Sequence, residues 1–331
     1  METRQLGRTG LAVSVLGFGC GAVGGLMTRG NPADQERAVA RAVELGLNYF
    51  DTAAMYGNGE SERNLGRVLK SLKPAILVGT KVRVPDGERG RIGAAITASL
   101  EASLQRLQLD RVDLFQLHNH ITADGGDGGF TPETVLGEVV PAFERLRQQG
   151  KTRFCGITAV GDTAALHQVV DRRVFDTAQV SYNLLNPSPG AAVSPGYPAH
   201  DFGNLLAHAK SADMGVINIR VLAAGALSGT EDRHPLGSPN VEPIGSGGSY
   251  RIDVERARRL EPLIREGHAE SLVDAALRFA IANDAVSTVL VGYSTLDQLE
   301  YAARVINKGP LSAAALARLG ELQRGFVGEQ R

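Results

Sequence analysis

Residues 47–66, LNYFDTAAMYGNGESERNLG, contain one complete example of the unit from which the fold is built. Its first residues, Leu47–Phe50, form a short apolar run that predicts a buried strand, and Asp51 follows that run directly. Tyr56 lies in the turn that comes next, and Glu60–Ser71 then repeats apolar residues at helical spacing. A buried strand, a polar loop and an amphipathic helix in this order predict one β/α unit with polar side chains in its loop.

The same unit recurs along the chain, because apolar runs of strand length alternate with segments of helical periodicity. The predicted strands span residues 13–20, 47–50, 76–81, 112–118, 153–158, 177–182, 216–221 and 287–291. The predicted helices span residues 33–45, 60–71, 91–107, 131–149, 163–170, 202–211, 272–282, 296–306 and 312–326. Eight units predict an α/β fold of the (β/α)8 or TIM barrel type, since the competing doubly wound sheet rarely accommodates so many consecutive units.

Both ends of the chain add to the barrel. Thr3–Leu6 and Leu11–Val15 flank Gly7–Gly10, which predicts an N-terminal β-hairpin that caps the bottom of the barrel. The segments 272–282 and 312–326 are expected to form additional C-terminal helices. A chain of 331 residues would suit two average domains, but barrels of this length usually form one, so we expect a single domain over residues 1–331.

Composition limits the expected partners. The net charge is −1 and the pI about 6.7, which indicates neither nucleic acid nor an anionic membrane as a partner. The start METRQLGRTGLAVS lacks the apolar core of a signal peptide, and no run of 18 apolar residues occurs. The two cysteines, Cys20 and Cys155, form no metal or redox spacing and fit a reducing compartment. We therefore expect a cytoplasmic protein, and the sequence does not indicate its oligomeric state.

Four polar side chains of different kinds fall at the ends of neighbouring predicted strands or in the loop just after one of them. Asp51 ends the second strand, Tyr56 lies in the loop after it, Lys81 ends the third strand and His118 ends the fourth. Each of them alone has a structural explanation: a helix cap, turn packing, a solvated lysine or a hydrogen-bonded rim histidine. Because the carboxyl ends of barrel strands share one mouth, we expect the four side chains to meet there, and their combination favours a catalytic site.

Together these side chains suit proton transfer at a carbonyl or an alcohol. An ammonium at Lys81 is expected to stabilise the phenolate of Tyr56 and so to make the phenol a usable acid and base. Asp51 would keep Lys81 charged, and a neutral His118 would orient the substrate oxygen. The accompanying hydride needs a nicotinamide, because no side chain supplies one. We therefore predict an oxidoreductase that reduces a carbonyl or oxidises the matching alcohol.

These motifs resemble the aldo-keto reductase family over nearly the whole chain. The matching segments are LGFGCG (16–21), FDTAAMYGNGESERNLG (50–66), VGTKV (78–82), RVDLFQLHNH (111–120), GKTRFCGIT (150–158), DTAQVSYNLLN (176–186), VLAAGALSG (221–229) and VLVGYSTLDQLE (289–300). The resemblance identifies Asp51, Tyr56, Lys81 and His118 as the family's catalytic tetrad. It also implies NADP or NAD as the cofactor and a small-molecule carbonyl, alcohol or sugar lactol as the substrate.

The resemblance further implies which residues hold the cofactor. Gln179 matches the glutamine that holds the nicotinamide carboxamide, whereas Thr158-Ala159 replaces the usual Ser-Asn pair and Ile219 replaces the aromatic residue that stacks on the nicotinamide. Arg220 falls where a small polar residue is common, and we hypothesise that it reaches the cofactor pyrophosphate. The implied cofactor-binding residues are Gly19, Cys20, Asp51, Thr158, Gln179, Ile219, Arg220, Leu222, Gly225, Leu227, Gly292, Ser294 and Gln298.

The region that would contact a 2′-phosphate departs from the family. Many members have Arg or Lys just after the glycine that corresponds to Gly292, whereas this chain continues with Tyr293 and Ser294, and Ala302 stands at a position that is usually Asn. A 2′-phosphate site generally requires a cation. We therefore predict a weaker preference for NADPH than is usual and use of NAD(H), with Arg304 and Arg220 as alternative sources of charge.

The substrate pocket is expected to be partly apolar, which favours a small aldehyde, ketone, sugar lactol or aromatic aldehyde over a phosphorylated compound. Its lining is expected to comprise the loop 228–251 and the residues Met27, Met55, His118, His120, Phe130 and Tyr182. His118 and His120 have no third ligand near them in the sequence, so we expect no metal site. The glycines of residues 17–25 are not followed at once by a helix, so they are weak evidence for a dinucleotide-binding loop.

Three other functions remain open on the sequence alone. A Schiff-base lyase using Lys81 would need no nicotinamide and would be trapped by borohydride. A non-catalytic, cofactor-binding regulatory subunit would use the same fold without turnover. The third possibility is a protein that has the same fold but another function, because fold does not determine function.

Overall fold

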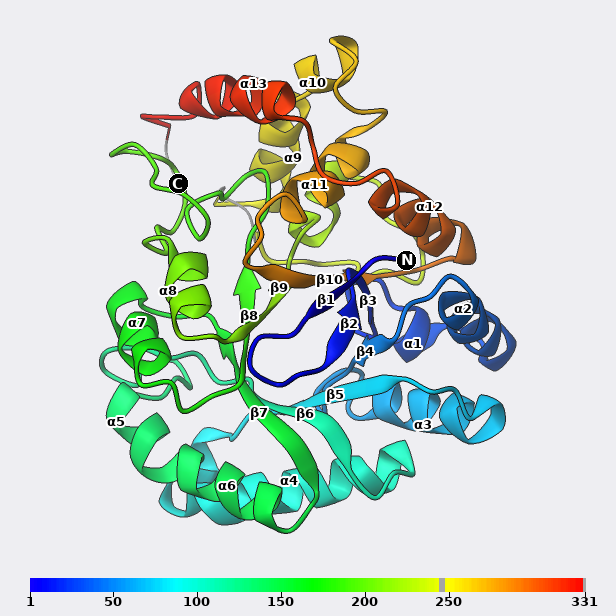
Figure 1. The fold of residues 1–331 in the computed structure, drawn as a ribbon, viewed down its shortest axis with the longest axis vertical. Coiled ribbons are helices and arrows are strands. Elements are labelled where there is room, and N and C mark those ends of the chain that lie inside the picture. The colour runs from blue at the N-terminus through cyan, green and yellow to red at the C-terminus, as the bar shows by residue number, and fades with distance from the viewer. Residues whose placement is uncertain (244–247, 330–331) are drawn as a thin grey trace.

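The structure is a computed structural model of the chain, and it describes residues 1–243 and 248–329. Parallel strands close into a barrel in the order β10-β3-β4-β5-β6-β7-β8-β9, which confirms the predicted (β/α)8 fold (Figure 1). The barrel strands are β3 (Leu16–Gly19), β4 (Tyr49–Asp51), β5 (Leu77–Val82), β6 (Val112–Leu117), β7 (Thr152–Ala159), β8 (Thr177–Ser181), β9 (Gly215–Ile219) and β10 (Val286–Gly292).

The barrel strands are buried on both faces, since side chains fill the inside and helices cover the outside. Every residue of β4 and of β8 is buried, for example. Strands in this environment need apolar residues in succession rather than in alternation. The continuous apolar runs of the sequence therefore predicted the positions of the strands.

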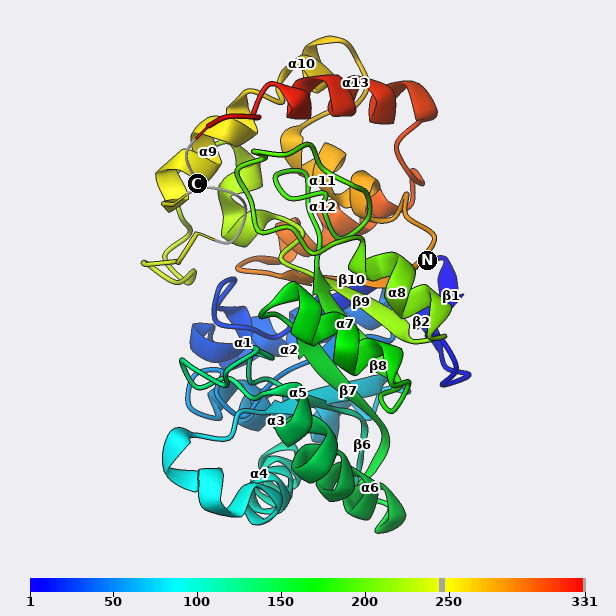
Figure 2. The same ribbon diagram turned by 90° about the vertical axis from the view of Figure 1, so that its left-hand side faces the viewer.

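Helices surround the barrel in both views (Figures 1 and 2). They are α1 (Leu26–Arg29), α2 (Pro32–Glu44), α3 (Glu60–Leu72), α4 (Ile92–Leu107), α7 (Thr163–Asp171), α8 (Leu205–Ser211), α11 (Leu272–Ala280) and α12 (Leu296–Ile306). Helix α2 begins with Pro32 after the capping side chain of Asn31, and Thr295 caps α12 in the same way. Within the described residues, no helix combines the length and the apolar composition that crossing a membrane requires.

An N-terminal hairpin closes the amino-terminal end of the barrel, as predicted. Strands β1 (Thr3–Gln5) and β2 (Ala12–Ser14) pair antiparallel. Leu6, Leu11 and Val13 of the hairpin pack into one cluster with barrel residues that include Ile217 and Leu290. Arg4 donates a hydrogen bond of 2.9 Å to the backbone oxygen of Val286, the first residue of β10. The carboxyl-terminal end of the barrel is thus left for the functional loops.

The helix predicted over residues 131–149 is interrupted. It consists of α5 (Pro132–Thr134), a π-helical turn (Val135–Val139) and α6 (Val140–Gln148). Pro141 explains the interruption, because proline has no backbone N–H and its ring clashes with a carbonyl one turn earlier in a regular α-helix. The wider turn avoids that clash.

Two helices within residues 250–265 were not predicted from the sequence: α9 (Tyr250–Arg258) and α10 (Pro262–Arg265). The buried face of α9 contains Asp253 and Arg256 as well as Val254. Because charged residues occupy this buried face, the apolar periodicity that reveals most helices is missing. Both helices lie with α13 (Ala313–Arg324) beyond α11, at one end of the molecule (Figure 1).

Candidate active site

A buried ion pair occupies the floor of the barrel mouth. Asp51 ends β4 and lies beside Gly79 of β5 in register, two residues before Lys81. The Nζ atom of Lys81 donates hydrogen bonds to Oδ1 of Asp51 and, at 2.8 Å, to the backbone oxygen of Thr52. Its third polar neighbour is the hydroxyl of Tyr56 at 3.3 Å. Lys81 and Asp51 are only 1% and 3% exposed, so this lysine is not the solvated strand end that its sequence position alone would suggest.

The second oxygen of the Asp51 carboxylate is also occupied. It accepts hydrogen bonds from the hydroxyl of Tyr49 at 2.8 Å and from Nε2 of Gln179 at 2.7 Å. Gly79 makes room for Tyr49, because a Cβ atom at this glycine would lie 2.5 Å from the Tyr49 hydroxyl. The carboxylate is thereby held in one orientation by donors from three strands.

The electrostatics of the mouth set the charge of each group. Burial opposes the ammonium of Lys81, but Asp51 and Tyr56 outweigh this effect and raise the pKa of Lys81, so it stays charged. Burial, reinforced by the Asp51 charge, raises the pKa of Tyr49 and keeps its hydroxyl a donor. Burial, followed by the charges of Lys81 and Arg83, lowers the pKa of His118 to about 3. His118 is therefore a neutral imidazole at physiological pH.

Tyr56 lies at the open side of this cluster. Its ring meets the imidazole of His118 edge-on, with ring centres 5.9 Å apart and planes at 84°. Gly57 and Gly59 follow with φ values of 60° and 85°, which let the chain turn sharply into α3. Tyr56 itself is partly exposed, so its hydroxyl faces both Lys81 and the mouth. The four side chains predicted to meet do lie together.

The residues implied for the cofactor lie on strands β3, β4, β7, β8, β9 and β10 or in the segments that follow β3, β9 and β10. Residues 222–229 follow β9 and residues 292–298 include the end of β10, which pairs with both β9 and β3. Thr158 of β7 lies beside Gln179 of β8 in register, and its hydroxyl is buried without a hydrogen-bond partner in the described part of the chain. An orphaned hydroxyl next to an amide is the donor and acceptor set that a carboxamide requires. These residues therefore fit a nicotinamide.

The polar groups of Ser294, just before α12, are already hydrogen-bonded, and Arg304 lies in the last turn of that helix. The hydroxyl of Ser294 donates to the backbone oxygen of Gly24 at 2.5 Å, and the backbone N–H of Ser294 donates to Gln298 at 2.8 Å. Arg304 forms an ion pair of 3.2 Å with Glu270. Lys308 is also bound to Glu270, at 2.8 Å. Arg304 and Lys308 are thus paired with a carboxylate, whereas Arg29, whose guanidinium lies beside Gly25, donates to the backbone oxygens of Leu236 and Ala22.

The residues predicted to line the substrate pocket lie in different environments. Met55 is 49% exposed and His120 is also exposed, so both are accessible to a ligand. Met27 and Phe130 are buried in the main hydrophobic core. The ring of Tyr182 packs against Phe279 of α11 at 4.6 Å. Of the predicted loop 228–251, residues 244–247 lie outside the described residues.

Sequence reasoning missed Tyr49 as a partner of Asp51. The signal was present, because side chains two positions apart on a strand point to the same face. It also missed Arg83, the residue after the end of β5, which lowers the pKa of His118. A basic residue after a barrel strand is too common on a protein surface to be recognised without the neighbouring strands.

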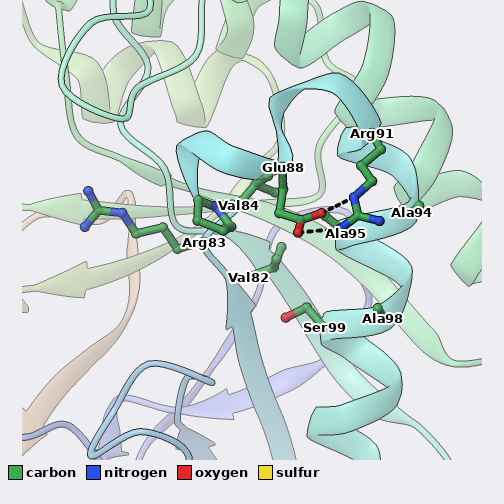
Figure 3. Close-up of a pocket in the computed structure, with 10 residues that line it drawn as sticks. Val82, Arg83, Val84, Glu88, Arg91, Ala94, Ala95, Ala98 and Ser99 are labelled. Carbon is green, nitrogen blue, oxygen red and sulfur yellow. Dashed lines mark hydrogen bonds and ion pairs between the residues drawn. The ribbon is translucent and has the colours of Figure 1, made fainter.

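A separate hollow of about 460 Å³ lies on the outer side of β5, against α4 (Figure 3). Its lining includes Val82, Ala95 and Ser99. At its rim, the guanidinium of Arg91 donates two hydrogen bonds to the carboxylate of Glu88, from Nε at 2.6 Å and from Nη2 at 2.8 Å. None of the four tetrad residues lines this hollow, but Arg83, the residue that follows β5, does.

The comparison with protein families agrees with this geometry. Residues 15–324 match the model of the aldo/keto reductase family. This chain belongs to the aldo/keto reductase family. An aldo-keto reductase from Bacillus halodurans, solved in its holo form, superposes with a TM-score of 0.71 at 26% identity, covering 100% of this chain and 98% of that one.

Curated relatives of this aldo-keto reductase are oxidoreductases. L-galactose dehydrogenase of Arabidopsis thaliana is 33% identical over 313 residues, which cover 91% of this chain and 86% of the relative. D-threo-aldose 1-dehydrogenase of a Pseudomonas species is 30% identical, covering 94% and 95%. Pyridoxal 4-dehydrogenase of Microbacterium luteolum is 26% identical, covering 90% and 91%. The chain is thus an NAD(P)-dependent oxidoreductase that acts on CH–OH groups.

Proposed function

We propose that this aldo-keto reductase interconverts an aldehyde, ketone or sugar lactol with its reduced or oxidised partner, with Tyr56 as the general acid and base. The observation that carries the proposal is the hydrogen-bonded chain from Tyr56 through Lys81 to Asp51 at the barrel mouth. A phenol transfers protons poorly at neutral pH unless a neighbouring cation stabilises its anion. Lys81 is such a cation, and Asp51 keeps it charged in a buried place.

In the reducing direction, a carbonyl oxygen accepts hydrogen bonds from Tyr56 and His118 and then takes the proton of the Tyr56 hydroxyl. The nicotinamide, when bound, supplies the hydride to the carbonyl carbon. Lys81 stabilises the phenolate that remains until a proton returns from solvent. In the oxidising direction, the phenolate of Tyr56 removes the alcohol proton. A neutral His118 donates one hydrogen bond without competing for the proton.

The preferred cofactor in this proposal is NAD(H). Two observations support it: the side chain of Ser294 is turned toward Gly24, and Arg304 is paired with Glu270. A 2′-phosphate placed near Ser294 would lose part of its hydration without gaining the charge of Arg304, which is already paired. Separate titrations of NADH and NADPH, followed by the fluorescence of the reduced nicotinamide, test this preference, since the chain has no tryptophan whose emission would report binding. Tighter binding of NADPH would contradict it.

The relatives' names support an aldose or an aromatic aldehyde as the starting point for a substrate search. The decisive experiment combines such a panel with Tyr56→Phe, which removes the proton donor but keeps the ring. We expect turnover to fall by about 10²–10⁴-fold while NADH affinity stays close to that of the wild type.

Tyr197→Phe is the matched control for Tyr56→Phe, because the Tyr197 hydroxyl donates only to the backbone oxygen of Leu185, at 3.0 Å. It should keep full turnover. Undiminished turnover in Tyr56→Phe would rule out the proposed acid and base. Trapping of a carbonyl compound on Lys81 by borohydride, without any nicotinamide, would instead support a Schiff-base lyase.

A further inference from the structure

Two arginines at the barrel mouth have no role in the tetrad. Arg83 directly follows β5, and Arg220 directly follows β9. In the closed barrel, β6, β7 and β8 separate these strands on one side, and β10, β3 and β4 separate them on the other. The two arginines therefore start from diametrically opposite points of the mouth, and long side chains from both can approach the space between them.

Arg83 is placed beside the tetrad by the pairing of β5 with β6. Val82 lies opposite Leu117, and the backbone N–H of His118 donates to the oxygen of Val82 at 2.7 Å. Arg83 is thus the next residue beside His118. Its side chain extends away from Glu88 and Arg91 (Figure 3). Its Nη2 atom would lie 3.3 Å from a Cβ atom at Gly128, which places the guanidinium against the loop that follows β6.

Arg220 is held in an uncommon backbone conformation. Its φ is 59°, a left-handed value that few residues other than glycine adopt. The side chain of Asn183 donates to the backbone oxygen of Arg220 at 3.1 Å and helps to fix this conformation. Ala223 and Ala224 in the same loop are also left-handed. Backbone strain of this kind clusters at ligand sites, where the surrounding structure imposes it.

Neither guanidinium has a partner in the part of the chain that the structure describes: no hydrogen bond or ion pair of either side chain is formed there. Arg220 is nevertheless only partly exposed. Burial and then the charges of Arg220 and Arg83 lower the pKa of His120, so both cations act on this imidazole. Glu242 is exposed, and its negative charge acts on both His120 and Arg220 without forming an ion pair with either. Arg83 is exposed, whereas Arg220 is a partly buried cation, and such a cation is costly unless an anion joins it.

We propose that Arg83 and Arg220, together with His120, bind an oxyanion group of the substrate, a carboxylate or a phosphate, at the mouth of the active site. The proposal rests on the proposed function for the reacting end of the substrate, which Tyr56 and His118 would hold. Guanidinium groups suit this task because their paired N–H donors match two oxygens of a carboxylate or phosphate. The substrate is then an aldehyde, ketone or lactol that also carries an anionic group, rather than the uncharged compound that the sequence favoured.

The test measures binding without turnover. Benzoate, phenyl phosphate and the uncharged benzamide are titrated by calorimetry into the protein saturated with NADH. We expect at least one anion to bind about tenfold or more tightly than benzamide, and the tighter anion identifies the oxyanion class. Arg83→Met and Arg220→Met should each remove most of this preference, since each deletes one charged donor. Arg91→Met is the matched control, because Arg91 is paired with Glu88 and should leave the preference intact.

Equal affinity for the three probes would overturn the proposal. Weaker binding of NADH to Arg220→Met, with an unchanged preference for anions, would also overturn it and assign Arg220 to the cofactor pyrophosphate. Reduction of 4-carboxybenzaldehyde and of its methyl ester separates the two proposals. Turnover of both compounds with equal efficiency would refute the anion site alone. An enzyme that binds benzoate in preference to benzamide, but neither reduces these aldehydes or the search panel nor oxidises the matching alcohols, would refute the proposed function alone.

Discussion

Gln179 of β8 donates a hydrogen bond of 2.7 Å to Asp51 of β4, across the interior of the barrel. The two strands lie opposite each other in the closed sheet. The same carboxylate accepts from Tyr49 on its own strand and from Lys81 on the next one. The ion pair at the floor of the mouth is therefore anchored from both sides, and its loss should affect stability as well as activity.

Asp51→Asn should lower the free energy of unfolding by about 3–5 kcal/mol at pH 7, because it leaves the buried Lys81 ammonium without its anion. Asp51→Asn combined with Lys81→Met should recover part of that loss, since both charges are then absent. Urea denaturation of Asp51→Asn, Lys81→Met and the double variant measures the coupling between the two side chains as a double-mutant cycle. Strict additivity of the single effects would show that the two side chains are not coupled.

The stability of the protein should depend on His118 below about pH 6. The pKa of His118 is about 3 in the folded protein, against 6.5 for an unperturbed histidine. As the pH falls below 6.5, the unfolded chain therefore takes up a proton that the folded protein does not, and stability decreases toward pH 3. His120 contributes in the same direction, because its pKa is also lowered.

His118→Gln should remove most of this dependence. Between pH 7 and pH 5, the wild type should lose about 1–2 kcal/mol more than the variant in urea denaturation. His268→Gln is a suitable control, since His268 follows α10 rather than a barrel strand, with its Nε2 atom 3.7 Å from Glu266. Parallel pH profiles for the wild type and His118→Gln would show that His118 titrates normally.

Both cysteines should be inert in the folded protein. Cys20 and Cys155 are 1% and 3% exposed, and burial raises the pKa of each thiol. Since the thiolate is the reactive form, a water-soluble disulfide reagent should label neither residue until the chain is unfolded in urea. The absorbance of the coloured thiolate that the reagent releases, recorded before and after unfolding, measures how many cysteines react. Rapid labelling of the folded protein would indicate that the mouth opens far enough to expose Cys20.

Close packing of α3 on α4 should make Gly66 irreplaceable. A Cβ atom at Gly66 would lie 2.5 Å from the backbone oxygen of Arg106 and 2.6 Å from that of Leu107. Gly66→Ala should therefore cost about 1–3 kcal/mol of stability. Gly320→Ala in α13 is the control, because open space surrounds that position, and it should stabilise the protein by about 0.5–1 kcal/mol. Thermal or urea unfolding measures both, and equal effects would contradict the packing argument.

Local patterns sufficed to predict most of the architecture. Barrel strands are buried on both faces, so they appear as continuous apolar runs, and each helix carries an apolar stripe toward them. The same logic failed for α9, because Asp253 and Arg256 are buried on it. It also missed the π-helical turn before α6, where Pro141 forces a wider turn.

The barrel and the four tetrad residues, which lie at or soon after the ends of neighbouring strands, could be predicted from the sequence alone, since both follow from short-range order along the chain. Which distant residues meet follows only from the tertiary structure: Gln179 bonds to Asp51, and Arg304 pairs with Glu270. These relationships depend on closure of the barrel, which brings opposite strands to one mouth. No periodicity along the chain records that closure, because it is a property of the whole sheet.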